Sequence, residues 1–362
     1  MAKEFEIKKD KEYLLKRMGD ISQLAGIKQY ELTDGKAKGV AAVDIKTGSG
    51  LSFTVLPGRG MDIAWTEYRG IPISYISKTG VVSPSYYEEN GVGFLRNFFA
   101  GMLTTCGLSN VGWPCEEIDP FLGKISYGIH DRISNTVADH ICVSEEWEND
   151  NYVMSVSGKV RESMLHMENL LLSRKISTTM GESSFTINDI IENCGFSPQP
   201  LMILYHINVG YPIVDAGSRF VCNSNSIFGL NNAAKENIET YGSINEPIPK
   251  FMERVYSHDL KKDSNADTYV AIVNDKLELG LYVRFNKDQL PAFIQWKQLG
   301  EAEYVIGLEP ANNVPSSRIE HKNNNTLQYL NPGEKKHIDV EIGILKNKSE
   351  IYDMVNLIEH LE

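Results

Sequence analysis

Alternation of apolar and polar residues dominates the middle of the chain, and this pattern predicts half-buried β-strands. The segments that show it are residues 39–50, 51–57, 170–193, 268–286 and 337–345. Two of these segments contain a turn dipeptide near their middle, Gly181-Glu182 and Asn274-Asp275, and each therefore predicts two strands joined by a short turn. Because no long helical pattern separates the strands, we predict antiparallel sheets packed face to face.

Only the two ends of the chain show a helical period of three and four residues. Near the start, the apolar positions on one helical face are Tyr13, Leu14, Met18, Ile21 and Leu24. Gly26 then offers a stop. Near the end, Ser349 is a candidate cap for a helix with apolar positions at Ile351, Met354, Val355, Ile358 and Leu361. We therefore predict an N-terminal helical extension (residues 1–26), one large all-β domain (27–347) and a C-terminal helix packed on that domain (348–362).

Composition and charge narrow the range of partners. The chain has 362 residues, 42% of them hydrophobic and 23% charged, with a formal net charge of -12. This charge argues against nucleic acid and anionic membrane surfaces and is compatible with a neutral small molecule. No apolar run approaches the ~20 residues that cross a bilayer, and the first residues lack the apolar core of a secretion signal. The five cysteines are scattered without a CxxC pair, so we expect a reduced, cytoplasmic protein, and homo-oligomerisation is left open.

Glu309 stands where a predicted strand is expected to end. It follows an apolar approach in the segment YVIGLEPANN and precedes Pro310. Because proline donates no hydrogen bond to a β-ladder, the strand should stop there. A carboxylate at a strand end can point into a cleft, although a surface position is the usual place of a glutamate. Glu309 is therefore a candidate for acid–base chemistry, with a solvated surface residue as the alternative.

A second candidate lies in the segment LYHINVGYP. Its alternation puts Leu204, His206 and Asn208 on one face of a strand and the intervening residues Tyr205 and Ile207 on the other. A face that carries both histidine and asparagine lines a polar cavity or a solvated surface. His206 is thus either a structural histidine with a hydrogen-bonded neighbour or a functional one.

Further polar residues stand in apolar or glycine-containing surroundings. The candidates for substrate binding are Asn208 on the face of His206 together with His130, Arg96, Arg59, Asp62 and Lys297. His130 is alternatively a loop histidine in an ion-pair cluster with its neighbours Asp131 and Arg132. Arg96, read as a buried arginine, would hold a carboxylate or a ligand oxygen. Arg59 and Asp62 could simply pair with each other, and Lys297 after Trp296 could belong to a sugar-binding face or a packed surface.

Several familiar motifs are missing from the sequence. It contains no GxGxxG after a strand, no GxxxxGK[ST], no HExxH and no GxSxG, so nucleotide chemistry and serine hydrolysis lose their usual sequence support. His130, His206 and Glu309 are residue types that bind metals, but their spacing matches no metal motif. We therefore predict no cofactor and no metal, with a metal site of these three residues as a minor alternative.

Taken together, these segments resemble the galactose mutarotase-like superfamily, and more closely its aldose 1-epimerase-like branch. The resemblance spans about residues 40–345. The segments that carry it are NCGFSPQPLMILYHINVGYPIVD, IQWKQLGEAEYVIGLEPANNVP, LPGRGMDI, GMLTTCGLSNVG and GIHDRIS. It implies a single large antiparallel β-supersandwich, and an isomerase that interconverts the anomers of a free monosaccharide without a cofactor.

The resemblance also implies roles for individual residues. His206 matches the general acid of the family and Glu309 its general base. His130 matches a sugar-contacting histidine, although Asp131 stands where many relatives have glycine. Arg96 and Arg59 compete for the role of an arginine that holds a sugar hydroxyl. An aspartate that grips hydroxyls in relatives has no clear match here, so hydroxyl recognition is expected to differ.

Three readings of the function remain. The first is a mutarotase or related epimerase, the second a carbohydrate-binding protein with the same fold and no catalysis, and the third a metal-dependent sugar isomerase. A phosphosugar substrate would require a basic pocket that the acidic composition does not suggest.

Overall fold

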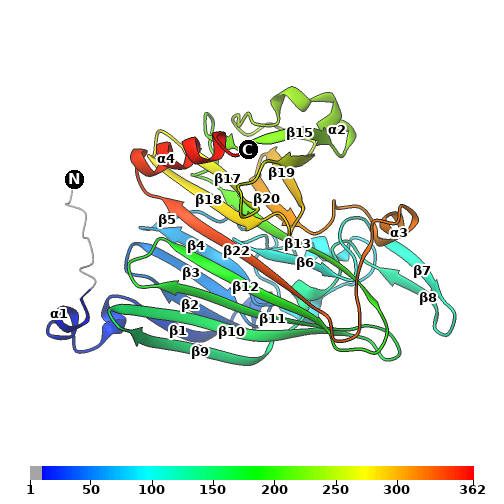
Figure 1. Cartoon of the computed structure of the whole chain (residues 1–362), viewed down its shortest axis with the longest axis horizontal. Helices are drawn as coiled ribbons and strands as arrows, with labels where there is room; N and C mark the ends of the chain where they lie inside the picture. Colours follow the sequence, from blue (N-terminus) through cyan, green and yellow to red (C-terminus); the bar gives the residue numbers. More distant parts are fainter. Residues whose placement is uncertain (1–9) are drawn as a thin grey trace.

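The computed structural model describes residues 10–362, which form three antiparallel sheets and a separate hairpin (Figure 1). The longest sheet has eight strands in the spatial order β14-β17-β18-β22-β12-β11-β10-β9. Its strands are β9 (Asp139–Glu148), β10 (Asn151–Ser163), β11 (Asn169–Thr179), β12 (Ser184–Asn193), β14 (Arg219–Val221), β17 (Asp267–Asn274), β18 (Leu279–Asn286) and β22 (Lys335–Leu345). The predicted turns at Gly181-Glu182 and Asn274-Asp275 join β11 to β12 and β17 to β18, as expected.

A second sheet of seven strands follows the order β15-β16-β19-β20-β13-β21, with β6 also paired to β13. Its strands are β6 (Thr104–Leu108), β13 (Gln199–Gly210), β15 (Ser224–Gly229), β16 (Arg254–Leu260), β19 (Ala292–Gly300), β20 (Glu303–Ala311) and β21 (Gln328–Leu330). The third sheet consists of β1 (Gly26–Leu32), β2 (Val40–Lys46), β3 (Leu51–Leu56), β4 (Asp62–Tyr68) and β5 (Ile71–Pro72). Strands β7 (Cys115–Asp119) and β8 (Gly123–Tyr127) form the hairpin.

The helices are short and peripheral (Figure 1). They are α1 (Lys11–Leu15), α2 (Asn232–Glu236), α3 (Arg318–Asn323) and α4 (Lys348–Glu359), with the 3₁₀ turns η1 (Ile21–Gln23), η2 (Gly35–Ala37), η3 (Pro84–Tyr86), η4 (Gly93–Arg96), η5 (Ile133–Asn135) and η6 (Ile238–Thr240). Within residues 10–362, none of these helices has the length and apolarity that a membrane crossing requires. The prediction of an all-β protein with short helices at both ends is confirmed.

Two helix predictions need correction. The C-terminal helix forms, but it begins at Lys348 and is capped by Asn347, whose side chain accepts from the Glu350 N–H at 3.0 Å, rather than by Ser349. Near the start, the single helix expected over residues 13–24 is wrong. The chain forms α1 and η1 as separate turns because the Asp20 side chain accepts from the Ser22 N–H at 2.8 Å and starts a new turn there.

The largest hydrophobic cluster is built from the inner faces of all three sheets and includes Phe53, Val156, Ile187, Ile207 and Leu308. A smaller cluster, which we call the outer cluster, lies on the other face of β13 and β20. Its buried members are Phe94, Cys106, Val111, Met202, Leu204, Ile294 and Ala311. Strands β13 and β20 are thus covered on both faces, so a polar side chain on either face of them is withdrawn from water.

Candidate active site

Strands β13 and β20 bring His206 and Glu309 into direct opposition. Their antiparallel register pairs Leu204 with Ala311 and Ile207 with Leu308, so His206 stands opposite Glu309. The imidazole Nε2 lies 3.2 Å from the carboxylate Oε1, and both side chains are more than nine-tenths buried. Two residues that lie about a hundred positions apart in the sequence thus form one buried pair.

Pro310 shapes the strand beside this pair but does not end it, contrary to the sequence prediction. Strand β20 continues to Ala311, and its ladder with β19 runs without interruption through Pro310, which lies opposite Phe293. On the other edge, the ladder with β13 has no pairs at Glu309 and Pro310. Because proline has no N–H to donate, the contact between β13 and β20 is interrupted next to His206 while β19 holds the strand in place.

The predicted alternation along β13 is confirmed. Tyr205 and Ile207 point into the largest hydrophobic cluster. His206 and Asn208 are also buried, on the face of the outer cluster. Gly307, two residues before Glu309, shares this face, and a Cβ at that position would lie 2.6 Å from Glu309 Oε1 and 3.3 Å from His206 Cε1. Glycine is therefore required here to leave space for the pair.

Aromatic rings surround the imidazole of His206. The centroid of the Phe98 ring lies 5.0 Å from it, that of the Trp296 ring 5.3 Å, and that of His130 6.2 Å. Phe98, Trp296 and His130 are only partly buried. The buried pair is thus flanked by partly exposed aromatic rings, which suit the apolar face of a sugar ring.

Three buried polar atoms on this face have no hydrogen-bond partner within residues 10–362: His206 Nδ1, Glu309 Oε1 and Asn208 Oδ1. The amide of Asn208 donates to the His206 carbonyl at 2.8 Å, which orients its own oxygen. The His206 and Glu309 side chains are close, but the ring N–H does not have the alignment of a hydrogen bond to Oε1. Buried polar groups are almost always paired in folded proteins, so a cluster of unpaired ones indicates a place for a ligand or water.

Burial favours the neutral form of both members of the pair. It lowers the pKa of His206 to about 3, with a smaller contribution from His130. It raises the pKa of Glu309 well above its ordinary value, with a smaller contribution from the negative charge of Glu253. These directions favour a neutral imidazole beside a protonated carboxyl, and such a pair can present both a proton acceptor and a proton donor to a bound molecule.

His130 faces the site and stays outside the ion pairs of its segment. Its Nδ1 accepts from the Gly112 N–H at 3.3 Å, which leaves Nε2 as the protonated nitrogen of a neutral ring. Burial lowers its pKa to about 4. The ion-pair cluster expected around it forms without it, because Arg132 pairs with Asp131 at 3.4 Å and with Glu89 at 3.1 Å.

Two basic residues proposed from the sequence lie away from the pair. Arg96 is exposed and lies 3.3 Å from Glu88, so the expectation of a buried arginine is wrong. Lys297 is buried on the opposite face of β19, where it donates to the carbonyls of Thr240 and Ser243. Trp296, its neighbour on β19, lies at the site instead, because successive side chains of a strand point to opposite faces.

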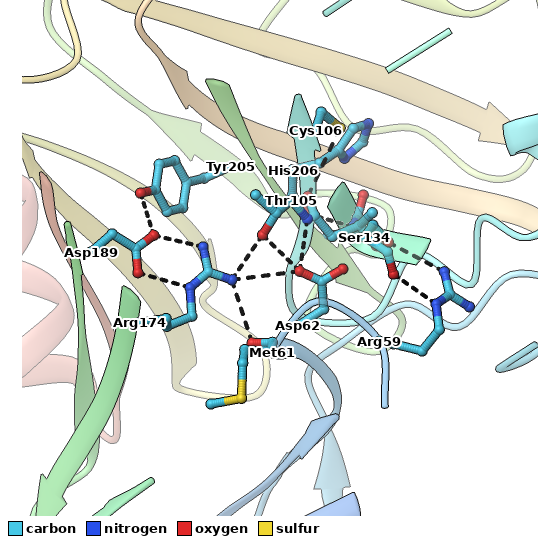
Figure 2. A network of polar contacts seen from close by, with 12 residues as sticks. Arg59, Met61, Asp62, Thr105, Cys106, Ser134, Arg174, Asp189, Tyr205 and His206 are labelled. Atoms are coloured by element: carbon cyan, nitrogen blue, oxygen red, sulfur yellow. Dashed lines mark hydrogen bonds and ion pairs between the residues drawn. The ribbon is translucent and has the colours of Figure 1, made fainter. Parts of the chain in front are cut away.

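Arg59 and Asp62 do not pair with each other and serve the framework beneath the site (Figure 2). The Arg59 guanidinium is fully buried and donates to backbone carbonyls, among them Ser134 O at 2.8 Å and Asn97 O at 3.2 Å. Asp62 accepts from the Thr105 N–H at 2.9 Å and from its hydroxyl at 2.7 Å. Burial raises the pKa of Asp62 to about 6.

An ion pair that was not predicted from the sequence lies at the centre of this framework. Arg174 on β11 and Asp189 on β12 stand directly opposite each other, with two contacts of 2.9 and 2.7 Å. The Tyr205 hydroxyl donates to Asp189 at 2.6 Å, and Arg174 donates to the Thr105 hydroxyl at 2.8 Å. Figure 2 shows the Tyr205 ring directed to this network and the His206 ring directed away from it. The sequence offered a signal for this pair, because Arg174 and Asp189 are charged residues at core positions of two consecutive predicted strands.

No group of three or more histidine, cysteine, aspartate or glutamate side chains within residues 10–362 is arranged to hold a metal ion. His130, His206 and Glu309 share the site without such an arrangement.

Comparison with known proteins supports the family resemblance. Residues 37–344 match the family model described as "Domain of unknown function (DUF4432)". The chain is similar to the structure of a proposed aldose 1-epimerase from Klebsiella pneumoniae, with 26% identity, a TM-score of 0.85 and coverage of 94% of this chain and 90% of that one. No curated protein matches the chain.

More distant structures share the fold. A galactose mutarotase-like protein from Clostridium acetobutylicum has 12% identity and a TM-score of 0.63, with 89% of this chain and 99% of that one covered. Galactose 1-epimerase from Lactobacillus acidophilus has 13% identity and a TM-score of 0.57, with 88% and 98% covered. These matches confirm the galactose mutarotase-like fold expected from the sequence.

Proposed function

The chain belongs to the DUF4432 family and has the galactose mutarotase-like fold, and from this premise we propose that it is an isomerase that interconverts the anomers of a free monosaccharide. His206 and Glu309 act as the acid–base pair, and His130 and Asn208 bind the sugar. Neither a metal nor an organic cofactor takes part in the proposed reaction.

One observation carries the proposal: a histidine and a glutamate, 3.2 Å apart across two strands, are buried together with unpaired polar atoms. A structural pair would be expected to satisfy its hydrogen-bonding atoms, because leaving them unpaired costs about 1–3 kcal/mol each. A pair that alternately gives and takes protons needs those atoms free for the substrate. The fold of a proposed aldose 1-epimerase at 26% identity supports the same assignment.

The chemistry needs one proton donor and one proton acceptor at the same time. Hydroxyl groups of the sugar donate to Glu309 and favour its ionised form, so the proton of the pair moves to His206. Glu309 then takes the proton of the anomeric hydroxyl while His206 protonates the ring oxygen, and the bond between the anomeric carbon and the ring oxygen breaks. After rotation of the carbonyl group, the reverse transfers close the ring on its other face. Each group is expected to contribute roughly 10²–10⁴-fold.

Magnetisation transfer by NMR measures anomer exchange directly and tests the proposal. A panel of aldoses and ketoses is examined with the wild type, with Glu309→Gln and with the control Glu303→Gln. The control makes the same chemical change at the start of the same strand, where Glu303 pairs with Lys78 at the surface. We expect accelerated exchange for at least one sugar, lost in Glu309→Gln and kept in Glu303→Gln. Acceleration that survives in Glu309→Gln would overturn the assignment.

The carbohydrate-binding protein remains the second candidate, because the aromatic wall of Phe98 and Trp296 suits sugar binding with or without catalysis. Saturable sugar-induced shifts without any acceleration of exchange would establish it and exclude the mutarotase.

A further inference from the structure

We propose that Glu162 is a positioning residue, which holds the segment of residues 107–112 so that this segment in turn holds His130 at the sugar. This inference rests on the proposed function, in which His130 binds the sugar, and deepens it. Glu162 is the last residue but one of β10, and the sequence gave it no role.

The alternation of β10 directs Glu162 inward, in series with Val160 of the largest hydrophobic cluster. Its side chain is fully buried, and a carboxyl group at a core position costs free energy unless its oxygens are paired. Both oxygens are bonded to the segment 107–112. Oε2 accepts from the Leu108 N–H at 2.9 Å, and Oε1 accepts from the Ser109 hydroxyl.

The same segment binds His130 at both of its ends. The Gly107 N–H donates to the His130 carbonyl at 2.9 Å. At the other end, the Gly112 carbonyl accepts from the His130 N–H at 3.2 Å, and the Gly112 N–H donates to the imidazole Nδ1 at 3.3 Å. The last contact restrains the ring as well as the backbone, so the direction of the imidazole depends on the place of this segment.

The backbone at His130 needs such support. His130 has a φ of 58° and Asp131 a φ of 51°, in the left-handed region that costs free energy for residues other than glycine. Such a conformation persists only where the surrounding structure imposes it. The Tyr87 hydroxyl contributes by donating to the Asp131 carbonyl at 2.8 Å. The other restraints come from the segment 107–112, so without the hold of Glu162 on that segment His130 should relax away from its present direction.

Three variants separate positioning from stability. Glu162→Met removes both contacts at similar volume and leaves the Leu108 and Ser109 donors without their acceptor. Glu162→Gln keeps both contacts, because its oxygen accepts from the Leu108 N–H while its amide donates to the Ser109 hydroxyl, which can rotate. Thr178→Val is the control for stability. It removes a buried hydrogen bond of 2.7 Å to the Ser184 carbonyl at the other end of the β10–β11 pair.

Anomer exchange kinetics are measured for the sugar that is turned over, with thermal unfolding of each protein. We expect Glu162→Met to raise KM about tenfold and to keep kcat within about threefold, because His130 binds the sugar equally in the ground and transition states. Glu162→Gln and Thr178→Val should keep KM within about twofold. A loss of stability alone would lower the folded fraction, and with it kcat, at an unchanged KM. If Glu162→Met does not fold, Ser109→Ala removes one of the two contacts and should raise KM about threefold.

The His130 ring gives a second readout that does not depend on turnover. In protein with ¹³C-labelled histidine rings, the His130 resonance is assigned by its loss in His130→Gln. It should shift in Glu162→Met and stay in place in Glu162→Gln.

An unchanged KM or an unchanged His130 resonance in folded Glu162→Met would overturn the role of Glu162 while leaving the mutarotase intact. An equal rise of KM in Glu162→Gln and Glu162→Met would also overturn it, since the charge of Glu162 and not its two contacts would then matter. A wild type that accelerates no sugar would instead overturn the proposed function, while the resonance still decides whether Glu162 positions His130.

Discussion

The two faces of strand β13 carry polar clusters of opposite character. On the inner face, Tyr205 meets the ion pair of Arg174 and Asp189, in which three nitrogens and both carboxylate oxygens are bonded. On the outer face, the next residue, His206, meets Glu309 with polar atoms of both side chains unpaired. Burial is complete in both places, so solvent exposure does not explain the difference.

Charge separates the two clusters as well. Although burial alone would lower it, the pKa of Arg174 is raised by the Asp189 carboxylate, so Arg174 stays charged. Burial drives His206 and Glu309 to their neutral forms. Asp62 belongs to the inner network but is intermediate, because its Oδ2 has no partner and its pKa rises to about 6. A satisfied ionised cluster can hold a strand in place, whereas an unsatisfied neutral one can exchange protons with a ligand.

The largest effect on stability is expected from the inner face. Arg174→Met should lower the free energy of unfolding by about 3–5 kcal/mol, because it leaves the Asp189 carboxylate buried without its partner. Arg219→Met, which breaks an exposed pair with Asp275, is the control and should cost no more than about 1 kcal/mol. Denaturant unfolding measures both, and equal small losses would contradict the structural role of the inner pair.

The outer pair should show the opposite response. Glu309→Met should abolish anomer exchange yet raise the free energy of unfolding by about 1–3 kcal/mol, because it removes an unpaired buried polar group. Glu303→Met near the start of the strand should change stability by no more than about 0.5 kcal/mol. A destabilised Glu309→Met protein would mean that the outer pair supports the fold, as the inner one does.

Steric crowding of the outer pair offers a milder test. Gly307→Ala introduces a Cβ 2.6 Å from Glu309 Oε1 and 3.0 Å from Trp296 Cβ, so the carboxylate must move. We expect kcat/KM to fall by about 10–100-fold, since a displacement of about 1 Å costs up to 10²-fold. Gly242→Ala, where no atom lies within 4 Å of the added Cβ, should leave the exchange rate unchanged. The same rate in both variants would show that the position of Glu309 is not critical.

The smallest effect is expected from pH. Activity requires one proton on the pair of His206 and Glu309. A second proton binds only as the pH falls toward the His206 pKa of about 3. The single proton leaves only above the raised pKa of Glu309. The value of kcat/KM should therefore fall by no more than about threefold as the pH is lowered from 7 to 5, and on the alkaline side it should fall only above the raised pKa of Glu309. A pH–rate profile with a midpoint near 6.5 would show that His206 titrates as an exposed histidine.

Local pattern was sufficient to predict most of the fold. The alternation of residues 170–193 and 268–286 predicted β11, β12, β17 and β18 with their turns, because each pair is formed by neighbours in the sequence. The separation of α1 from η1 was missed because the Asp20 side chain, which accepts from the Ser22 N–H and starts the second turn, leaves no mark on the apolar period. The continuation of β20 past Pro310 was missed because the N–H that proline lacks is needed on one edge of the strand only. The other edge pairs with β19 through Pro310.

The site was predicted only in part, because some of its residues show a local sequence signal and others do not. His206 and Glu309 were found because each stands in an apolar strand, where a polar side chain is conspicuous. Arg96 was misjudged because its apolar neighbours belong to a 3₁₀ turn whose last residue points to solvent.

Anomer exchange in four proteins tests the central claim most directly: the wild type, His206→Ala, Glu309→Gln and the double variant, each checked for folding by thermal unfolding. The account predicts that each single variant loses about 10²–10⁴-fold and that the double variant is no worse than the poorer single one, because the two residues act as a unit. Exchange that persists in either folded single variant would contradict the claim that the unpaired face of β13 is the catalytic one.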